Sequence, residues 1–243
     1  MSGGFRLAGG GGPVIPNFGQ GTACLRHNHW FCTSWFREHW GDIFQPALVQ
    51  HVELTLIAVG IGFAIAFALA LAGFRWRFAD APLGAFTDFL YTLPSIALFK
   101  LLVPVTGLTV TTIEIPLVAY TLFVLYRNIV AGLKSVPDEV LESARGMGLT
   151  RAQTFFRVEL PLAAPAILAG IRVATVATIS IATIAAVVLY KGLGGPIFDA
   201  IGQPDIFRTE LVGAGGLAIL LALTADALLA LVQRALTPWS RLR

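Results

Sequence analysis

The stretch LTLIAVGIGFAIAFALALAG, residues 54–73, runs for twenty residues without a charge. About 20 consecutive apolar residues are needed to cross the hydrocarbon core of a bilayer. The remainder of the chain agrees: of its 243 residues, 56% are hydrophobic and 13% are charged, whereas a soluble domain has about 25% charged residues. The sequence therefore predicts a membrane protein and excludes disordered, fibrous and disulfide-scaffold classes.

Four further apolar blocks follow this first span. They are residues 87–105, 113–133, 166–190 and 211–235. Thr106 and Gly107 supply a turn between the second and third spans. Because a chain in lipid must satisfy its backbone polar groups internally, the predicted fold class is all-α: a polytopic membrane helix bundle of about five transmembrane helices, with six left open.

The basic residues of the loops predict the orientation. If the first turn, the long central loop and the tail share one side, that side holds nine Lys and Arg residues: Arg75, Arg77, Lys134, Arg145, Arg151, Arg157, Arg234, Arg241 and Arg243. The loops of the other side hold Lys191 and Arg208. Since Lys and Arg favour cytoplasmic loops, the C-terminus is predicted to be cytoplasmic and the N-terminus outside. The predicted domains are an extracytoplasmic segment (1–46), a transmembrane domain (47–235) and a cytoplasmic tail (236–243).

The extracytoplasmic segment carries aromatic residues and both cysteines of the chain. Trp30, Trp35 and Trp40 predict a short helix at the level of the lipid headgroups, with a plain soluble tail as the alternative. Cys24 and Cys32 form a disulfide or remain free thiols. Together with His27 and His29 they resemble a zinc set, but their spacing does not define a metal site, and we predict none.

Catalytic motifs are missing from the sequence. It contains no phosphate-binding GxxxxGK[ST] loop, no HExxH, no GxSxG and no histidine after His51. The basic residues are scattered between apolar blocks, which argues against nucleic acid as a partner. We therefore predict that the chain is no enzyme and holds no cofactor, and that any transport takes its energy from a partner or an ion gradient.

The loop between the third and fourth spans reads SVPDEVLESARGMGLTRAQTFFRVELP, residues 135–161. Its local signals predict two short helices. Ser135 is a candidate N-cap for the first, ahead of Pro137 and two acids in the opening turn. Gly148 stands where a left-handed residue ends a helix, and Thr150 with Gln153 forms a capping box that starts the second helix. Pro161 then predicts a bend into the fourth span.

This loop carries a recognisable signature. The pattern E-A-A-x3-G-x9-I-x-L-P is matched by Glu142, Ser143, Ala144, Gly148, Val158, Leu160 and Pro161. Only Ser143 and Val158 depart from it, both by small changes. The loop therefore resembles that of permease subunits of binding-protein-dependent ABC importers. The resemblance implies a pair of coupling helices that dock on a separate ATPase, which would bind ATP and Mg²⁺; two surface helices without a partner are the alternative.

The resemblance covers most of the chain from residue 47 onward and extends to the glycine betaine, carnitine and choline branch of these permeases. It rests on residues 92–98, 142–148, 158–172 and 192–197. It implies a bacterial or archaeal inner-membrane location, two ATP-binding subunits, a second permease subunit, identical or related, and an extracytoplasmic solute-binding protein. A methionine or amino-acid importer, an ion-driven secondary transporter and a scaffold without transport are the alternatives.

Polar residues at membrane depth are candidates for the solute path, because they are costly there. The candidates are Thr92, Ser95, Thr175, Thr178, Thr183 and Asp226. The alternatives are that the hydroxyl groups bond to their own helices and that Asp226 locks two helices together.

Small residues at every fourth position form stripes on two spans. They are Gly60, Ala64, Ala68 and Ala72 in the first, and Ala166, Gly170, Ala174, Thr178, Ala182 and Ala186 in the fourth. Such stripes allow close helix packing. For the first span we expect packing within the subunit. For the fourth span, two interpretations remain: packing within the subunit, or a seam between two permease subunits.

Overall fold

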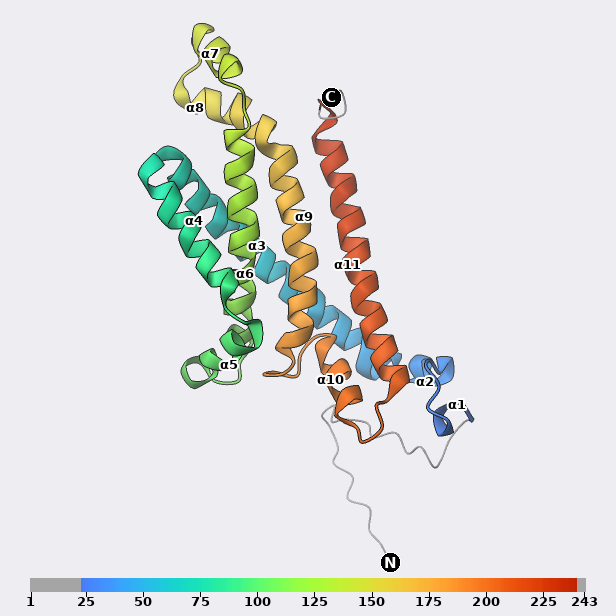
Figure 1. Ribbon diagram of the computed structural model, residues 1–243. Coiled ribbons are helices and arrows are strands. Elements are labelled where there is room, and N and C mark those ends of the chain that lie inside the picture. The colour runs from blue at the N-terminus through green and yellow to red at the C-terminus, as the bar shows by residue number, and fades with distance from the viewer. Residues whose placement is uncertain (1–22, 240–243) are drawn as a thin grey trace, which may run out of the picture.

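The computed structural model describes residues 23–239, and every regular element in that range is helical (Figure 1). The elements are α1 (Ala23–Arg26), α2 (Thr33–Glu38), η1 (Trp40–Phe44), α3 (Gln45–Arg75), α4 (Arg77–Thr92), α5 (Ser95–Thr106), α6 (Val110–Lys134), α7 (Asp138–Gly146), α8 (Arg151–Thr154), η2 (Phe155–Glu159), α9 (Leu160–Ala185), α10 (Gly194–Gly202) and α11 (Arg208–Leu236). Here η1 and η2 are short π-helical segments. The predicted all-α class is confirmed. Residues 1–22 and 240–243, which belong to the predicted N-terminal segment and tail, lie outside the described range.

Four helical stretches in the described range are long and apolar enough to cross a membrane. They are Trp40–Arg75, Val110–Lys134, Arg151–Ala185 and Arg208–Leu236. A fifth span is formed if α4 and α5, which meet at an angle of 93°, are counted together. The structure therefore agrees with about five spans.

The second predicted span, residues 87–105, is wrong as a continuous helix, because the chain breaks between α4 and α5. The residue before a proline is driven out of the α region, and Leu93, which precedes Pro94, has an extended backbone with ψ of 132°. The Tyr120 hydroxyl on α6 donates a hydrogen bond to the carbonyl oxygen of Leu93. This bond satisfies a backbone group that the break leaves without a helical partner.

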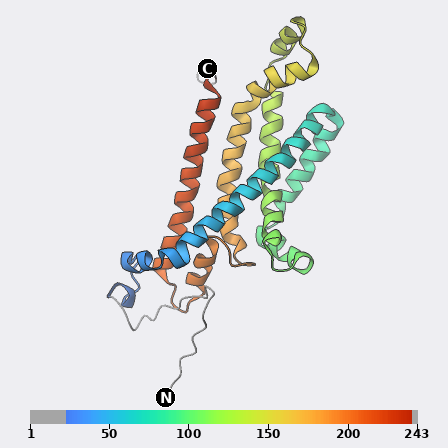
Figure 2. The ribbon, with the colours of Figure 1, turned by 180° about the vertical axis from the view of Figure 1, so that it is seen from behind.

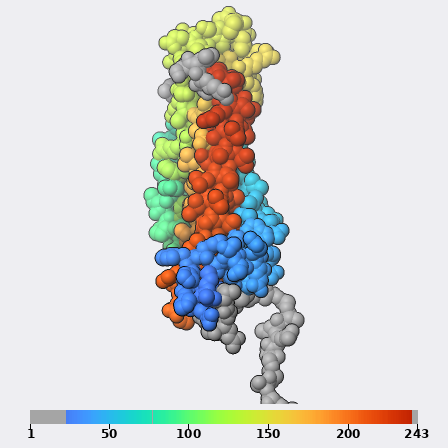
Figure 3. All heavy atoms as spheres, turned by 90° about the vertical axis from the view of Figure 1, so that its right-hand side faces the viewer, coloured from blue at the N-terminus to red at the C-terminus, as the bar shows by residue number. Residues whose placement is uncertain are grey.

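Helix α6 lies at the centre of the bundle, packed against α3 and α9. Its side chains Ile113, Leu125 and Ile129 are fully buried. Figure 1 shows α6, α9 and α11 side by side. Figure 2, which views the molecule from behind, shows α3 running obliquely across them. In Figure 3, α11 lies along the outside of the molecule. Consistent with that position, only 6% of its most apolar 18-residue stretch is buried inside the subunit.

Small residues allow the central helices to approach closely. On α9, a Cβ at Gly170 would lie 2.5 Å from the Cβ of Asn128 on α6, so the predicted stripe of this span packs within the subunit. On α3, the stripe expected from Gly60 to Ala72 is not the buried one: a Cβ added at Gly60 would meet no atom within 4 Å. The buried small residues of α3 are two positions away, at Ala58, Gly62, Ala66 and Ala70.

The two ends of the bundle carry different elements. Figure 1 shows α7, α8 and the C-terminal end of α11 at one end, and α10 with α1 and α2 at the other. We call these the α7 end and the α10 end. The described chain starts at the α10 end and finishes at the α7 end, as an odd number of crossings requires. The turn between α3 and α4 also lies toward the α7 end (Figure 1), so the three basic loop regions of the sequence follow elements that point to the same end.

The N-terminal segment is packed onto the start of α11. Trp35 is only 5% exposed, and its ring meets those of Phe44 and Phe207 edge to face, with centroids 6.0 and 4.7 Å away. The expectation that Trp35 lies among lipid headgroups is therefore wrong, because protein aromatic rings cover it. Trp30, in contrast, is 68% exposed, and the Arg208 guanidinium lies 4.9 Å from its ring centroid.

The two cysteines are joined. Cys24 and Cys32 form a disulfide bond across eight residues. Beside it, the Asn28 amide donates to the Ile206 carbonyl at 2.8 Å, and the Cys32 N–H donates to the Thr209 hydroxyl at 3.1 Å. The open choice between thiols and a disulfide thus resolves to the disulfide. Within residues 23–239 no group of three or more His, Cys, Asp or Glu side chains is arranged to hold a metal ion.

Candidate functional site

The α7 end presents the helix pair that the sequence predicts. Helix α7 has Asp138 and Glu139 in its first turn, where acids complement the helix dipole. Its N-cap is Pro137, and the Ser135 hydroxyl instead donates to the Gly132 carbonyl at 2.8 Å. The prediction that Ser135 caps this helix is therefore wrong: it still belongs to the last turn of α6, whose freed carbonyl is the nearer partner.

Gly148 ends α7 in the predicted left-handed conformation, with φ of +80°. Its N–H donates to the Arg145 carbonyl at 2.9 Å, and the Leu149 N–H donates to the Ala144 carbonyl at 3.2 Å. These two bonds form a Schellman motif, in which glycine avoids the steric cost of the left-handed region. Ala144 is 1% exposed, so the small residue in the middle of the signature fits a tightly packed position.

Helix α8 begins at the predicted capping box. The Gln153 N–H donates to the Thr150 hydroxyl at 3.3 Å, while the Thr150 N–H donates to the Gln153 side-chain oxygen at 2.8 Å. From α8 the chain continues through η2 into α9, and Figure 1 shows α8 running across the end of α9. The turn occurs in the π-helical segment just before Pro161. Val158, Leu160 and Pro161 are half-buried there, so the end of the signature lies where the helix pair meets the membrane-spanning helix α9.

The exposed surface of the helix pair carries apolar side chains together with charges of both signs, the basic ones being Arg145 and Arg151. Glu142 and Ser143 are exposed, and exposed apolar side chains accompany them, with Met147 at 72% and Phe156 at 65%. Behind the pair, a cavity of about 930 Å³ separates it from the end of α3. The arrangement offers a protruding surface that suits a partner protein better than it suits bulk water.

The six candidate path residues do not gather at one place. Thr92 and Ser95 flank the break between α4 and α5, and the Thr92 hydroxyl donates to the Phe89 carbonyl at 2.7 Å. On α9 the hydroxyl groups also bond to their own helix. Those of Thr175, Thr178 and Thr183 donate to the carbonyls of Ile171, Ala174 and Ser180 at 2.8, 2.8 and 2.7 Å. In the structure these hydroxyl groups therefore bond to carbonyls of their own helices, which is one of the two alternatives that the sequence left open.

Asp226 on α11 has an ionic partner that sequence reasoning did not identify. Arg172 on α9 donates two hydrogen bonds to its carboxylate, at 2.9 and 3.0 Å. A third, from Arg172 Nη1, goes to the side-chain oxygen of Gln233 at 3.0 Å. Gln233 in turn donates to the Pro165 carbonyl at 3.0 Å. Asp226 thus links the neighbouring helices α9 and α11. The sequence did not indicate this pair, because its two residues are 54 positions apart.

The glycine-rich loop at the α10 end is fastened to α3 by two side chains. His51 Nδ1 accepts a hydrogen bond from the Leu193 N–H at 3.2 Å, and its Nε2 lies 3.0 Å from the Ile179 carbonyl. An acceptor at Nδ1 and a carbonyl at Nε2 require the neutral Nε2–H tautomer. Gln50 accepts from the Gly192 N–H at 3.2 Å. Sequence reasoning noted the loop but not these two residues.

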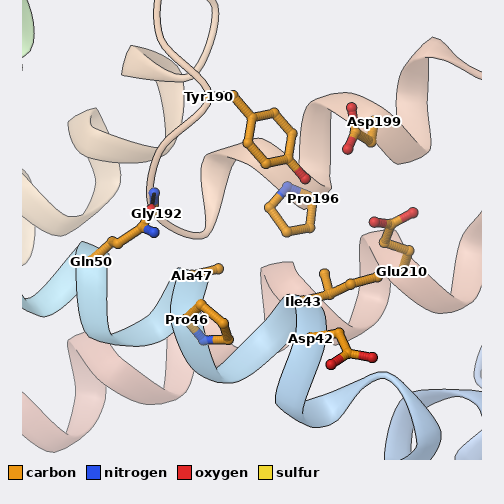
Figure 4. Close-up of a pocket in the computed structure, with 10 residues that line it drawn as sticks. All are labelled: Asp42, Ile43, Pro46, Ala47, Gln50, Tyr190, Gly192, Pro196, Asp199 and Glu210. Atoms are coloured by element: carbon orange, nitrogen blue, oxygen red, sulfur yellow. Dashed lines mark hydrogen bonds between the residues drawn. The ribbon is translucent and has the colours of Figure 1, made fainter. Parts of the chain in front are cut away.

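A pocket at the α10 end is a second feature that the sequence did not reveal. Figure 4 shows its lining residues, which come from η1, α3, the loop after α9, α10 and α11. Three of them are acids: Asp42, Asp199 and Glu210. Because they are far apart in the sequence and each lies among ordinary neighbours, only the fold brings them together.

Known proteins with similar sequences are transport permeases. A choline transport system permease protein of Bacillus subtilis (strain 168) is 33% identical over 78% of this chain and 86% of its own length. An osmoprotectant import permease protein of Salmonella typhimurium (strain LT2) is 36% identical over 78% of this chain and 89% of its own length. These relatives are permease proteins and not enzymes, which confirms the prediction of a transport subunit.

A solved structure shares the fold. It is an inward-facing form of the MetNI methionine ABC transporter, with a TM-score of 0.67 at 19% identity, covering 79% of this chain and 94% of that one. The model of the family described as binding-protein-dependent transport system inner membrane component matches residues 46–241. That family context implies ATPase and solute-binding partners. With a match over most of its length, the chain belongs to the binding-protein-dependent transport system inner membrane components, the permease subunits of ABC importers.

Proposed function

We propose that this permease imports a small osmoprotectant of the quaternary amine class: choline, glycine betaine, carnitine or a related compound. The observation that carries the proposal is its similarity to several permeases of that branch. Besides the two relatives above, a glycine betaine/carnitine/choline permease protein of Bacillus subtilis (strain 168) is 33% identical over 190 residues. A methionine substrate has weaker support, because the methionine transporter is related by its fold alone.

The energy would come from a separate pair of ATP-binding subunits, each holding ATP and Mg²⁺. The helix pair α7–α8 supports this assignment. Its Schellman turn and capping box fix the ends of the two helices, and its exposed surface carries apolar and charged side chains. Residues Glu142, Ser143, Ala144, Gly148, Val158, Leu160 and Pro161 would form this coupling element. A second permease subunit, identical or related, would complete the path, and a solute-binding protein would deliver the solute.

The α7 end would face the cytoplasm and the α10 end the exterior. The excess of Lys and Arg in the loops of the α7 end supports this orientation. The disulfide at the α10 end supports it too, because disulfide bonds persist in oxidising compartments. The hydroxyl groups of α9 and the residues Thr92 and Ser95 remain candidates for the path, and Asp226 would act there through its pairing with Arg172.

The experiment is uptake of radiolabelled choline, glycine betaine and methionine by cells that carry the complete system. We expect uptake of a quaternary amine that is lost when the ATPase subunit is inactivated, and purified permease alone should hydrolyse no ATP. Uptake of methionine without any quaternary amine would replace this substrate class with the amino-acid class. Uptake that survives ATPase inactivation but collapses with the ion gradient would contradict the assignment altogether.

A further inference from the structure

The pocket at the α10 end has the chemistry of a cation site. Its volume is about 300 Å³, at the lower end of the range of about 300–1,000 Å³ typical of small-molecule sites. It is lined by Asp42 from η1, Asp199 from α10 and Glu210 from α11, and no lysine or arginine lines it. The pocket therefore gathers three carboxyl groups from three separate elements.

Among the pocket residues, Glu210 gives the strongest reason to expect a bound ligand. It is 4% exposed, and none of the hydrogen bonds or ion pairs found among residues 23–239 involves it. Figure 4 shows its carboxylate turned into the pocket, toward that of Asp199. A buried charge without a partner is costly, so such a group is expected to meet a cation or to give up its charge.

Among residues 23–239, no basic side chain lines the pocket or forms an ion pair with its acids: Lys191, which lies between the lining residues Tyr190 and Gly192 in the sequence, is not part of the lining. The ion pairs of the described chain join Arg127 to Asp88, Lys134 to Asp80 and Arg172 to Asp226, all elsewhere in the bundle. Arg208, two residues before Glu210, has its guanidinium over the Trp30 ring. The negative charge of the pocket is thus left for a bound solute.

The shape of the site favours a bulky cation over a metal ion. In residues 23–239 no three carboxylate, imidazole or thiolate groups converge closely enough to hold a metal. The Tyr190 ring lines the pocket beside the acids. An aromatic face next to carboxylates suits a quaternary ammonium group, which spreads its charge over methyl groups and forms no directed hydrogen bonds.

The walls of the pocket are held in place. A Cβ at Gly195 would lie 2.9 Å from the Tyr190 ring, so this glycine lets the ring lie flat against α10. Gln50 accepts a hydrogen bond from the Gly192 N–H at 3.2 Å and ties the loop to α3. Burial and the neighbouring carboxylates of Asp199 and Glu210 raise the pKa of the Tyr190 hydroxyl. The space left by the missing side chain of Gly195 and the Gln50 hydrogen bond therefore hold the Tyr190 ring and the loop in place.

We propose that this pocket binds the quaternary ammonium group of the solute and selects a cation such as choline over a zwitterion such as glycine betaine. Three carboxylates attract the ammonium group, but they repel the carboxylate that glycine betaine carries a few ångströms away. The proposal rests on the proposed function for its substrate class and orientation. It adds a selectivity site on the outer end of the permease.

The test uses the full chain in lipid nanodiscs, without ATPase or solute-binding protein, and titrates choline chloride and tetramethylammonium chloride by calorimetry. We expect both to bind the wild-type permease and glycine betaine to bind more weakly. Glu210→Gln should weaken choline binding by about tenfold, because one facing charge is lost. The matched control is Asp205→Asn, which removes an exposed acid of the same end that does not line the pocket; it should leave binding unchanged.

Three results would overturn the proposal: equal binding of choline and glycine betaine, wild-type affinity in Glu210→Gln, or displacement of choline by equimolar calcium chloride, which would indicate a metal site. Because the assay needs no partner subunit, these results bear on the pocket alone, whereas the cellular uptake experiment judges the proposed function.

A second measurement covers the case in which Glu210→Gln does not fold. Both native cysteines are in the disulfide, so Pro46→Cys places a single free thiol in the pocket wall. We expect this thiol to react faster with a trimethylammonium-bearing methanethiosulfonate than with a sulfonate-bearing one, and choline to slow the reaction. Equal rates with the two reagents, or no protection by choline, would count against a cation site.

Discussion

Arg172 on α9 and Asp226 on α11 form a bidentate ion pair, with Nε–Oδ1 at 2.9 Å and Nη2–Oδ2 at 3.0 Å. The two parallel hydrogen bonds fix the guanidinium and the carboxylate in one plane, which is the strongest geometry for such a pair. Helix α11 buries little of its surface in the subunit. The pair therefore adds a polar link between α11 and α9 to the packing of the two helices.

Asp226→Ala is expected to lower the thermal unfolding temperature of the purified permease, because it leaves the Arg172 guanidinium at membrane depth without its counter-ion. The charge-exchanged double variant Arg172→Asp with Asp226→Arg should recover part of the loss. The measurement is thermal denaturation in nanodiscs of one lipid composition. An unchanged unfolding temperature in Asp226→Ala would show that α11 is held by other contacts.

Gly62→Ala is expected to destabilise the contact between α3 and α6, because a Cβ at Gly62 would lie 1.8 Å from the Thr121 hydroxyl oxygen. Overpacking of this kind costs about 1–3 kcal/mol. Gly60→Ala on the same helix is the matched control, since a Cβ there meets nothing within 4 Å. The comparison is the free energy of unfolding of the two variants; equal values would mean that α3 does not pack on α6 as described.

Reduction of the disulfide should loosen the N-terminal segment from the start of α11. A bond that closes a loop of this length stabilises the closed form by about 2–3 kcal/mol on the chain-entropy account. Hydrogen–deuterium exchange of residues 23–44 should therefore rise with reductant, and in Cys24→Ser. If the exchange of this segment is the same with and without reductant, the hydrogen bonds from Asn28 and Cys32 are sufficient to hold it.

Single cysteines at Ser135 and Gly202 should react with a membrane-impermeant thiol reagent from opposite sides of the membrane. Ser135 follows α6 at the α7 end, and Gly202 ends α10 at the other. Both positions are exposed, and the native cysteines give no background because they are paired. Gly202→Cys should be labelled in intact cells and Ser135→Cys only after lysis. Labelling of both in intact cells would overturn the proposed topology.

The sequence alone is enough to predict features that depend on residues close together in the chain. The long apolar runs, the left-handed Gly148 and the capping box at Thr150 all follow from local chemistry, and the structure confirms each. The break at Pro94 is also a local signal. In the sequence this signal for a helix break is outweighed by the apolar run of residues 87–105, which continues through the proline and favours a single helix.

Features that depend on contacts between residues far apart in the chain could not be predicted from the sequence. The small-residue stripes of α3 repeat every fourth residue in two registers, and only the position of Thr121 on α6 selects the one with Gly62. In the same way, nothing near Asp226 points to Arg172, and nothing near Glu210 points to Asp42 and Asp199. Trp35 could not be placed correctly because its partner Phe207 lies far along the chain.

Gly148→Val should separate coupling from folding. Its φ of +80° strains a β-branched residue, at a cost of about 1–3 kcal/mol, although no atom lies within 4 Å of its Cβ position. Gly146→Val is the matched control, because Gly146 has equally open surroundings without a positive φ. We expect both variants to reach the membrane in wild-type amounts, as measured by immunoblot, and only Gly148→Val to lose transport.

The most direct test of the coupling assignment is ATP-driven uptake of radiolabelled choline by proteoliposomes that contain the permease with its ATPase and solute-binding protein. The variant is Glu142→Lys, which reverses a charge on the exposed face of α7. If Glu142 contacts the ATPase as proposed, the lysine should replace attraction by repulsion. We expect ATP-dependent uptake by the wild type, a steep loss of uptake in Glu142→Lys, and less ATPase co-purified with that variant. Uptake by Glu142→Lys at the wild-type rate with normal ATPase association, or uptake by the wild type driven by an ion gradient without ATP, would contradict it.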